Sequence, residues 1–381
     1  MINQNTDLIR IAKRENNKKR NYLVINRLQG KHIPVEPAKA LDMFGQLADC
    51  LRESNAGKKI LVIGFAETAT AIGAVVAVKS GAYYIQTTRE EIAGVSYICF
   101  SEEHSHATQQ RLVKEDLDQV MPGIERVVFA EDEVTTGHTI LNLVDALEQE
   151  YPGQAEYAVA SILNGMDETS LEVFKERGIC LYALVKTGQE DYSAALQNYV
   201  RKGDSVSLMR EKSGAVWENR EAVHASEHPA LAEIKIIGCM DARRLVSADA
   251  YQNACEKLYR EIERRLQEPL AGRILVLGTE EFMYPAMYAA DRMAQAGVQV
   301  WFHATTRSPA EVYKEAEYPL HVRYELPSLY DPHRRTFVYD IGTYDMVFII
   351  TDASCEDRTG LDALIQAVAV KNDKIVIVRW C

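Results

Sequence analysis

The sequence predicts an α/β fold of two tandem domains, each with a mostly parallel sheet. Two observations support this prediction. Runs of consecutive apolar residues, such as 127–130 and 347–350, are typical of strands that are buried on both faces of a parallel sheet. Strand-like and helix-like segments also alternate along the chain, and the pattern of the first half recurs in the last third.

The composition is that of a globular protein. A length of 381 residues suits two domains, and 47% of the residues are hydrophobic. The net charge of −12 argues against a large nucleic-acid footprint. There is no apolar run of about 18 residues or more, so we expect no membrane span. The 7 cysteines are scattered without a Cys-x-x-Cys pair, which favours a reducing, cytoplasmic location and no zinc site.

The two copies of the repeat can be aligned segment by segment. Residues 59–67 correspond to 273–281, since both are apolar strands that end in glycine before an acidic residue. Residues 86–90 correspond to 304–308, and we also expect the strand at 22–25 to correspond to 234–237, at an offset that stays between roughly 210 and 220 residues. A period of this length indicates a duplicated domain. The predicted organisation is a basic arm (1–20), a first domain (21–202), a linker (203–232) and a second domain (233–381).

The basic arm holds a cluster of charges between Lys13 and Arg20. A solvated, partly disordered tail is one interpretation of this composition. The other is an arm that folds over an anionic ligand or a partner subunit.

The most informative segment is the run from 127 to 139. An apolar strand, 127–130, is followed by Glu131 and Asp132, then by Thr-Thr-Gly-x-Thr, and then by the periodic apolar residues of a helix. Glycine lets the backbone approach a ligand closely, and backbone N–H groups at a helix N-terminus form a phosphate site. The predicted phosphate-binding residues are Val134, Thr135, Thr136, Gly137, His138 and Thr139.

The two acidic residues need a different partner, because carboxylates repel phosphate. Glu131 and Asp132 are placed to accept hydrogen bonds from vicinal hydroxyls one sugar-width away from that phosphate. The pattern therefore indicates a ribose 5-phosphate. The alternative is an ordinary strand–helix turn with a threonine N-cap.

The run resembles the signature of type I phosphoribosyltransferases: an apolar strand, two acidic residues, two variable residues and Thr-Thr-Gly-x-Thr. His138 stands where a small residue is usual, and Glu131 stands where aspartate is usual. Most of the chain resembles a family from tellurite-resistance (ter) gene clusters, in which an orotate phosphoribosyltransferase-like domain precedes a domain named for its Thr-Arg-Ser-Pro (TRSP) motif. That motif is present here at 306–309, and the segments 26–34 and 103–107 also resemble the family.

The resemblance implies a diphosphate site after the first strand. The loop Gly64, Phe65, Ala66, Glu67, Thr68 and Ala69 is expected to hold diphosphate through backbone N–H groups, although a plain strand–helix connection is the alternative. Thr88 and Arg89 end the next strand, and a guanidinium there can pair with diphosphate in a bidentate manner. The alternative for Arg89 is a surface arginine.

Two further segments correspond to the mobile catalytic loop of these enzymes and to the hood that covers the base. His104 and His106 lie where the family has its catalytic loop, so we expect an acid or a cation beside the diphosphate. A metal pair or a solvated loop without a role are the alternatives. Lys31, His32 and Asn164 are candidates for recognition of the base.

The second copy lacks the phosphate loop. At the position of Thr135, Thr136 and Gly137 it has Cys355, Glu356 and Asp357, and the two carboxylates would repel a phosphate. We therefore expect a degenerate second domain and one phosphoribosyl site per chain. The second copy keeps three candidates for a second anion site, which are Thr306, Arg307 and Ser308. The alternative is that these residues contribute to the first site across a domain interface.

The functional prediction is a Mg²⁺-dependent phosphoribosyltransferase (a pentosyltransferase) that moves ribose 5-phosphate from phosphoribosyl diphosphate to a nitrogenous base. Mg²⁺ would be held through the substrate, with Asp132 as a candidate protein ligand. The resemblance implies a role in nucleotide-like metabolism linked to tellurite and stress resistance. The alternative is a non-catalytic sensor that binds phosphoribosyl diphosphate or a nucleotide. A homodimer and an internal pseudo-dimer are both open.

Overall fold

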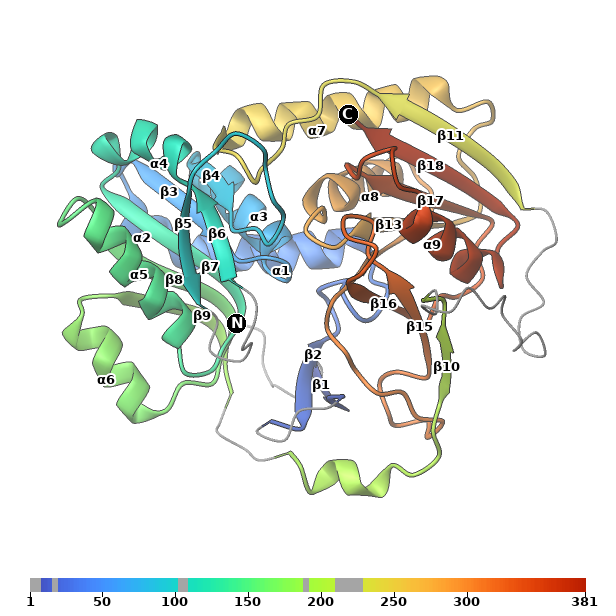
Figure 1. The fold of residues 1–381 in the computed structure, drawn as a ribbon, viewed down its shortest axis with the longest axis horizontal. Coiled ribbons are helices and arrows are strands. Elements are labelled where there is room, and N and C mark those ends of the chain that lie inside the picture. Colours follow the sequence, from blue (N-terminus) through green and yellow to red (C-terminus); the bar gives the residue numbers. More distant parts are fainter. Residues whose placement is uncertain (1–7, 16–19, 102–108, 188–191, 210–228) are drawn as a thin grey trace. The chain divides into compact units, whose positions relative to one another are not determined.

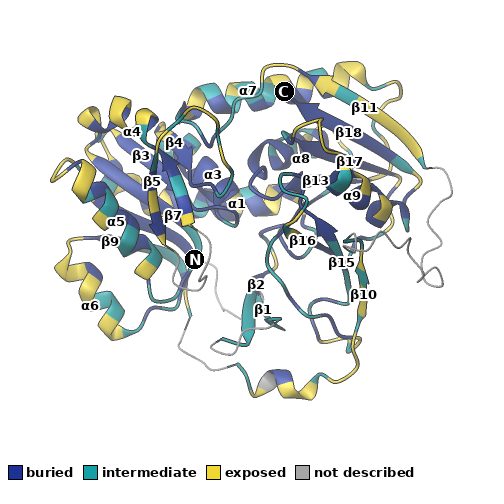
Figure 2. Ribbon diagram, in the orientation of Figure 1, coloured by how far each residue is buried: buried dark blue, intermediate teal, exposed yellow. Residues whose placement is uncertain are grey.

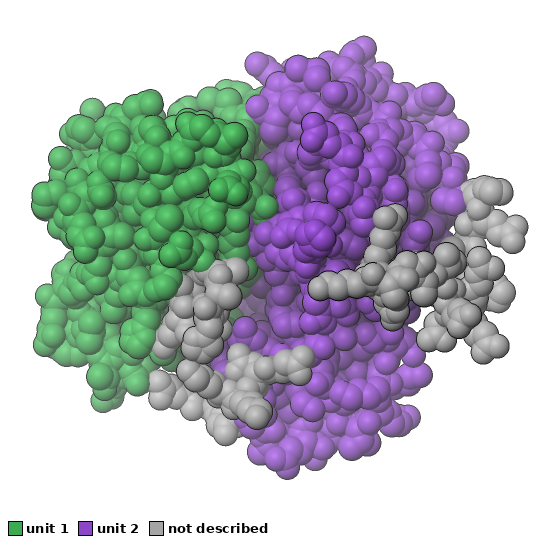
Figure 3. Space-filling model, in the orientation of Figure 1, with its two compact units in different colours: residues 1–3, 41–190, 240–255 green, residues 4–40, 191–239, 256–381 purple. Residues whose placement is uncertain are grey.

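The computed structural model describes residues 8–15, 20–101, 109–187, 192–209 and 229–381 (Figure 1). Their contacts divide the chain into two compact units (Figure 3). Unit 1 holds the described residues of 41–190 and 240–255, and unit 2 holds those of 4–40, 191–239 and 256–381. In the described residues, no helix has the length and apolar character needed to cross a membrane.

Unit 1 is built on a six-stranded sheet of order β12-β4-β3-β7-β8-β9, parallel except for β12. Helix α3 packs on β3, β4 and β7. Its elements are α1 (Pro37–Cys50, entering from unit 2), α2 (Arg52–Asn55), β3 (Ile60–Gly64), α3 (Thr70–Ser80), β4 (Tyr83–Gln86), β5 (Tyr97–Ser101), β6 (Gln109–Val113), α4 (Lys114–Val120), the 3₁₀ turn η1 (Met121–Gly123), β7 (Arg126–Val134), α5 (His138–Glu150), β8 (Glu156–Asn164), α6 (Glu168–Glu176), β9 (Cys180–Lys186), β12 (Val246–Ser247) and the start of α7 (Ala248–Arg265).

Local sequence explains these elements. All five residues of β3 are buried, as expected of a central parallel strand (Figure 2). Helix α3 lies so close to β3 that a Cβ on Gly73 would be 2.8 Å from the Cα of Gly64. Gly81 ends α3 in the left-handed conformation that favours glycine, and Asp167 caps α6 by accepting from the N–H of Ser170.

Unit 2 contains a five-stranded parallel sheet of order β11-β18-β17-β13-β14. Helix α8 packs on β13 and β14, and α9 packs on β15 and β18. Its elements are β1 (Ile9–Lys13), β2 (Tyr22–Asn26), the 3₁₀ turn η2 (Ala195–Asn198), β10 (Asp204–Ser207), β11 (Ala230–Ile236), the end of α7, β13 (Arg273–Thr279), α8 (Tyr284–Gln295), β14 (Gln299–Thr305), β15 (Val322–Pro327), β16 (Arg335–Tyr339), β17 (Met346–Thr351), α9 (Thr359–Ala369) and β18 (Lys374–Trp380).

The two main sheets share one topology, which confirms the predicted α/β fold. In unit 1 the order β4-β3-β7-β8 repeats as β14-β13-β17-β18 in unit 2. In both, the two antiparallel strands that follow the second strand return to its end, through the bridges Thr88–Arg111 and Thr306–Phe337. The fifth strand differs, because β9 follows the fourth strand in the chain whereas β11 precedes all the others.

Three details of the sequence-based description change. The strand at 22–25 is not the counterpart of 234–237, since β2 pairs antiparallel with β1 in a separate two-stranded sheet while β11 is parallel to β18. The predicted basic arm contains β1, because Leu8 and Ala12 are buried. The predicted linker contains β10, which pairs with β15.

Candidate functional site

The site in unit 1 lies at the carboxyl ends of β3 and β7. The chain passes from β3 to β4 on one side and then returns to β7 on the other side of β3. Such a reversal of strand order opens a crevice at the carboxyl edge, where open α/β sheets bind ligands. The sequence-predicted phosphate and diphosphate loops follow these two strands directly.

Strand β7 is longer than the sequence predicted, and this places the acidic residues within it. It pairs with β3 only as far as Ala130, whereas its pairing with β8 continues to Val134. Glu131 and Asp132 therefore lie on a stretch with β8 on one side and no continuation of β3 on the other. Both are half-buried, so their carboxylates are held by the strand and still reach solvent.

The loop from Thr135 to Gly137 connects β7 to helix α5. Gly137 has φ 77° at the helix N-terminus, and a Cβ there would lie 2.5 Å from the ring of Phe174. Only glycine fits this position. Among the described residues, no acceptor faces the backbone N–H of Thr135 or Gly137. Donors that remain open at a helix N-terminus are suited to an anion.

A hydrogen bond joins the diphosphate loop to the acidic strand. The hydroxyl of Thr68 donates to Oδ1 of Asp132 at 2.9 Å. The loop 64–69 and the acidic end of β7, which are far apart in the sequence, are therefore adjacent in space.

The peptide groups of Ala66 are held from both sides by buried side chains. The N–H of Ala66 donates to Oγ1 of Thr87 at 2.8 Å, and Nε2 of Gln110 donates to the Ala66 carbonyl at 3.1 Å. Thr87 in turn donates to Oε1 of Gln110. These contacts fix the loop backbone that would face a diphosphate. The sequence interpretation missed Thr87 and Gln110: Thr87 belongs to the Thr-Thr-Arg segment, whereas nothing local marks Gln110.

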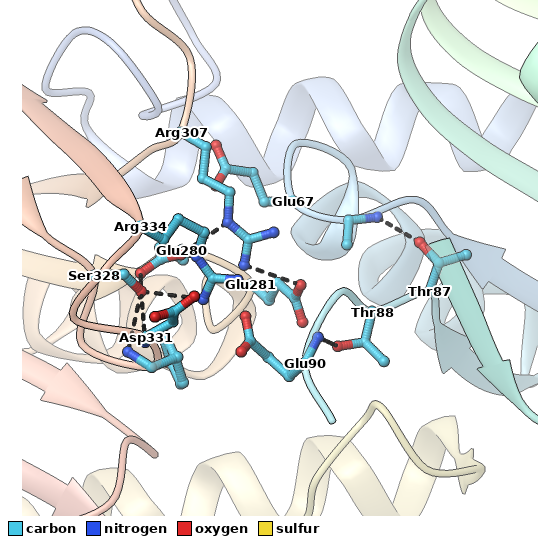
Figure 4. A network of polar contacts seen from close by, with 12 residues as sticks. Glu67, Thr87, Thr88, Glu90, Glu280, Glu281, Arg307, Ser328, Asp331 and Arg334 are labelled. Carbon is cyan, nitrogen blue, oxygen red and sulfur yellow. Dashed lines mark hydrogen bonds and ion pairs between the residues drawn. The ribbon is translucent and has the colours of Figure 1, made fainter. Parts of the chain in front are cut away.

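The segment after β4 turns sharply. Thr88 pairs with Arg111 through both backbone groups, and its hydroxyl accepts from the N–H of Glu90 at 2.9 Å (Figure 4). Arg89 is half-buried at this turn. The turn therefore places a guanidinium at the same sheet edge as the diphosphate loop.

The candidate base-binding residues fall in different units. Asn164 ends β8 in unit 1, where its Oδ1 accepts from the N–H of Met166 at 2.9 Å. Lys31 and His32 belong to unit 2 and are buried there. His104 and His106 lie outside the described residues.

His32 is enclosed in unit 2. Its ring lies 5.6 Å from that of Tyr339, and neither ring nitrogen has a hydrogen-bond partner among the described residues. Burial, together with the neighbouring Lys31 and His303, holds the pKa of His32 well below the ordinary value for histidine. Burial therefore favours the neutral form of the His32 ring.

Unit 2 has the same hydrogen bonds from backbone N–H groups at the equivalent loops, but different side chains surround them. The N–H of Glu280 donates to Oγ1 of Thr305 at 3.1 Å, as Ala66 does to Thr87, and the N–H of Ser308 donates to Oγ1 of Thr306. Arg307 stands in the place of Arg89. Figure 4 shows its guanidinium against Glu280 and Glu281, with Nε 2.8 Å from the Glu280 carboxylate. The arginine of the TRSP motif, Arg307, thus forms ion pairs with the two buried carboxylates of Glu280 and Glu281.

The loop after β17 differs from the loop after β7. The N–H groups of Ala353, Glu356 and Thr359 donate to side-chain oxygens of the loop itself. On its other side, Nη1 of Arg379 donates to the Ala353 and Ser354 carbonyls at 3.1 Å. A loop whose donors are satisfied internally has little to offer a phosphate.

Two models of known families match the chain, one in each half of the sequence. Residues 8–185 match the family model described as phosphoribosyl transferase, and residues 243–368 match the model described as TRSP domain C terminus to PRTase_2. The chain thus contains a phosphoribosyltransferase domain. More particularly, it carries the kind of phosphoribosyltransferase domain that is followed by a TRSP domain. No match was found among curated proteins.

Several solved structures are similar over about half of the chain. The adenine phosphoribosyltransferase of Rhodothermus marinus is 14% identical with a TM-score of 0.34, over 48% of this chain and 96% of that one. The enzyme of Thermoanaerobacter pseudethanolicus is 21% identical with a TM-score of 0.34, over 47% and 96%. That of Giardia lamblia, in complex with 9-deazaadenine, is 18% identical with a TM-score of 0.34, over 47% and 94%. Likenesses this distant assign no substrate.

Proposed function

We propose that unit 1 transfers ribose 5-phosphate from phosphoribosyl diphosphate to a nitrogenous base. The observation that supports this proposal is the hydrogen bond from Thr68 to Asp132, which joins the loop 64–69 to the strand that leads to Thr135 and Gly137, whose N–H groups have no acceptor among the described residues. A diphosphate site, a pair of carboxylates and a 5-phosphate site then follow one another in the order of the groups in phosphoribosyl diphosphate.

Each group has a separate task in this proposal. The backbone of Thr135, Thr136, Gly137 and Thr139 holds the 5-phosphate. Glu131 and Asp132 accept from the ribose hydroxyls and stabilise the positive charge that develops at C1 as the bond to diphosphate breaks. The backbone of 64–69 and the guanidinium of Arg89 hold the departing diphosphate. Most of the rate enhancement then comes from positioning and electrostatics.

The residues present fit Mg²⁺ that is held mainly by substrate. Among the described residues, no group of three or more His, Cys, Asp or Glu side chains forms a metal site. The carboxylates of Glu131 and Asp132 are oxygen ligands of the kind that Mg²⁺ accepts one or two of, beside phosphate oxygens and water. When bound, the ion would neutralise charge on the leaving diphosphate.

The finer parts of the proposal rest on the resemblance. They are recognition of the base by Lys31, His32 and Asn164, a part for His104 and His106 in catalysis, a cytoplasmic location, and a metabolic link to tellurite resistance. The acceptor base is left open.

The test is a screen of the purified chain with Mg²⁺, phosphoribosyl diphosphate and a panel of purines, pyrimidines and amines. Diphosphate release and product mass are followed together. We expect one class of base to give a nucleotide-like product, and Asp132→Asn to slow its formation about 10²–10³-fold. Tight binding of phosphoribosyl diphosphate without turnover on any base would instead support the sensor function.

A further inference from the structure

Strand β11 is an exposed edge of the unit 2 sheet. Among the described residues it pairs with β18 on one side only, and most of its own residues are exposed along its length (Figure 2). Leu231 is 52% exposed, and Ile237, the residue after the strand, is 74% exposed. Proteins usually protect such edges, because unpaired backbone groups and apolar side chains invite another strand.

The outward-facing backbone groups can be identified from the pairing with β18. The N–H of Ala230 donates to Asp373 and the carbonyl of Ile236 accepts from Cys381, both at 2.7 Å. Even-numbered residues therefore bond to β18, and in a strand the groups of the alternate residues face the other way. The outward groups belong to Leu231, Glu233, Lys235 and Ile237. Arg265 donates to the Lys235 carbonyl, which has a second lone pair for another donor.

These four residues form a pattern that is complementary to itself. When the segment is reversed about Ile234, Leu231 falls opposite Ile237 and Glu233 falls opposite Lys235. The apolar residues thus pair with each other, and so do the opposite charges. We propose that β11 pairs antiparallel with β11 of a second copy of this chain, about a two-fold axis beside Ile234.

Backbone hydrogen bonds and the apolar pairs would carry most of this interface. In that register the outward N–H and carbonyl groups of Glu233 face those of Lys235 in the other copy, as in a hydrogen-bonded antiparallel pair. The charged pair contributes less, because Glu233 already pairs with Arg379 and Arg358 at 2.7 and 3.0 Å. The result is an isologous dimer with one sheet continuing across both copies. It needs no substrate and is independent of the proposed reaction.

Sedimentation of the full-length chain over a concentration series tests the proposal. We expect a dimer that Ile237→Asp and Leu231→Lys each weaken about tenfold or more, a loss of about 1.4 kcal/mol. The double variant should regain most of that affinity, because the two new side chains face each other across the interface. Val200→Asp is the matched control, since Val200 is 75% exposed elsewhere in unit 2.

Melting temperatures of all variants establish that they remain folded, as expected for exposed positions. A chain that stays monomeric at about 100 µM would overturn the proposal, because the dissociation constant would then lie above the range of a specific dimer. So would a dimer that Ile237→Asp leaves unchanged, or a double variant that is no stronger than the single variants.

Discussion

The carboxyl edges of the two parallel sheets have the same backbone framework. They differ in which groups remain available to a ligand. In each unit, a threonine hydroxyl after the second strand accepts from the loop after the first strand: Thr87 from Ala66, and Thr305 from Glu280. In unit 1, two backbone donors of the loop after β7, at Thr135 and Gly137, have no acceptor among the described residues. In unit 2, Glu280 stands where unit 1 has Ala66, and its buried carboxylate pairs with Arg307.

This difference shows how a duplicated site can be filled without a change of fold. Glu280 is fully buried, has φ 49°, and binds Arg307 as an anionic ligand would. A non-glycine residue in the left-handed region is strained, so the surrounding contacts must hold it there. Side chains of the loop 351–357 accept from the N–H groups that would otherwise cradle a phosphate, and Arg379 donates to the loop's carbonyl oxygens. Unit 2 thus keeps the framework with its own groups in place of a ligand.

The largest expected effect separates the two equivalent aspartates. Asp132→Asn keeps the shape of the side chain and removes the charge, so we expect the phosphoribosyl transfer rate to fall about 10²–10³-fold. Asp352→Asn, at the equivalent position in unit 2, should leave the rate within about twofold, because it does not face the reaction. Steady-state diphosphate release measures both variants. Equal losses in the two would break the distinction between the units.

The next effect concerns the glycine of the phosphate loop. Gly137→Ala places a Cβ against Phe174 at φ 77°, so we expect affinity for phosphoribosyl diphosphate to drop about tenfold to a hundredfold through displacement of the loop. Gly153→Ala is the control, since its φ of 64° is also positive and its Cβ would meet nothing within 4 Å. Calorimetric titration compares them. If the control lost as much affinity, backbone strain alone would explain the result.

A smaller effect is expected at Gln110. Gln110→Met removes the hydrogen bond to the Ala66 carbonyl while keeping the side chain's size, at a cost of about 1–1.5 kcal/mol. Since the loop holds diphosphate before and during transfer, KM for phosphoribosyl diphosphate should rise about tenfold with little change in kcat. Thr336→Val, at the matching position in unit 2, should leave KM as it was. A change confined to kcat would contradict a positioning role.

The smallest effect is on stability alone. Asp116 accepts two hydrogen bonds from Arg244, at 2.6 and 2.7 Å, which tie residues 240–255 to α4 within unit 1. Burial opposes ionisation of Asp116, but Arg244 and the Leu245 N–H outweigh it and lower the carboxyl's pKa. The stability that this carboxylate provides is therefore present above the unfolded pKa of about 3.9 and lost as pH falls through the folded pKa.

Asp116→Asn should lower the free energy of unfolding by about 2 kcal/mol at neutral pH. The gap between the variant and the parent chain should close as pH falls below about 4, because protonation then removes the charge from the parent as well. Urea unfolding at several pH values measures it. A gap that is independent of pH would point to packing instead of the ion pair.

The sequence predicted the parts of this fold that depend on local pattern. Apolar runs marked β3, β7, β13 and β17, and the Thr-Thr-Gly run marked the loop before α5. The sequence did not predict that β7 continues through Glu131–Val134, because this largely polar segment forms a strand only by pairing with β8. Gln110 and the burial of His32 depend on contacts between distant segments, which no local pattern records.

The central claim is that each chain holds one phosphoribosyl site and that it lies in unit 1. Equilibrium titration of the full-length chain with phosphoribosyl diphosphate and Mg²⁺ tests it most directly. We predict one bound molecule per chain, with an affinity about tenfold to a hundredfold lower in Gly137→Ala and unchanged in Arg307→Lys. Two molecules per chain, or an affinity that Gly137→Ala leaves unchanged and Arg307→Lys abolishes, would contradict it.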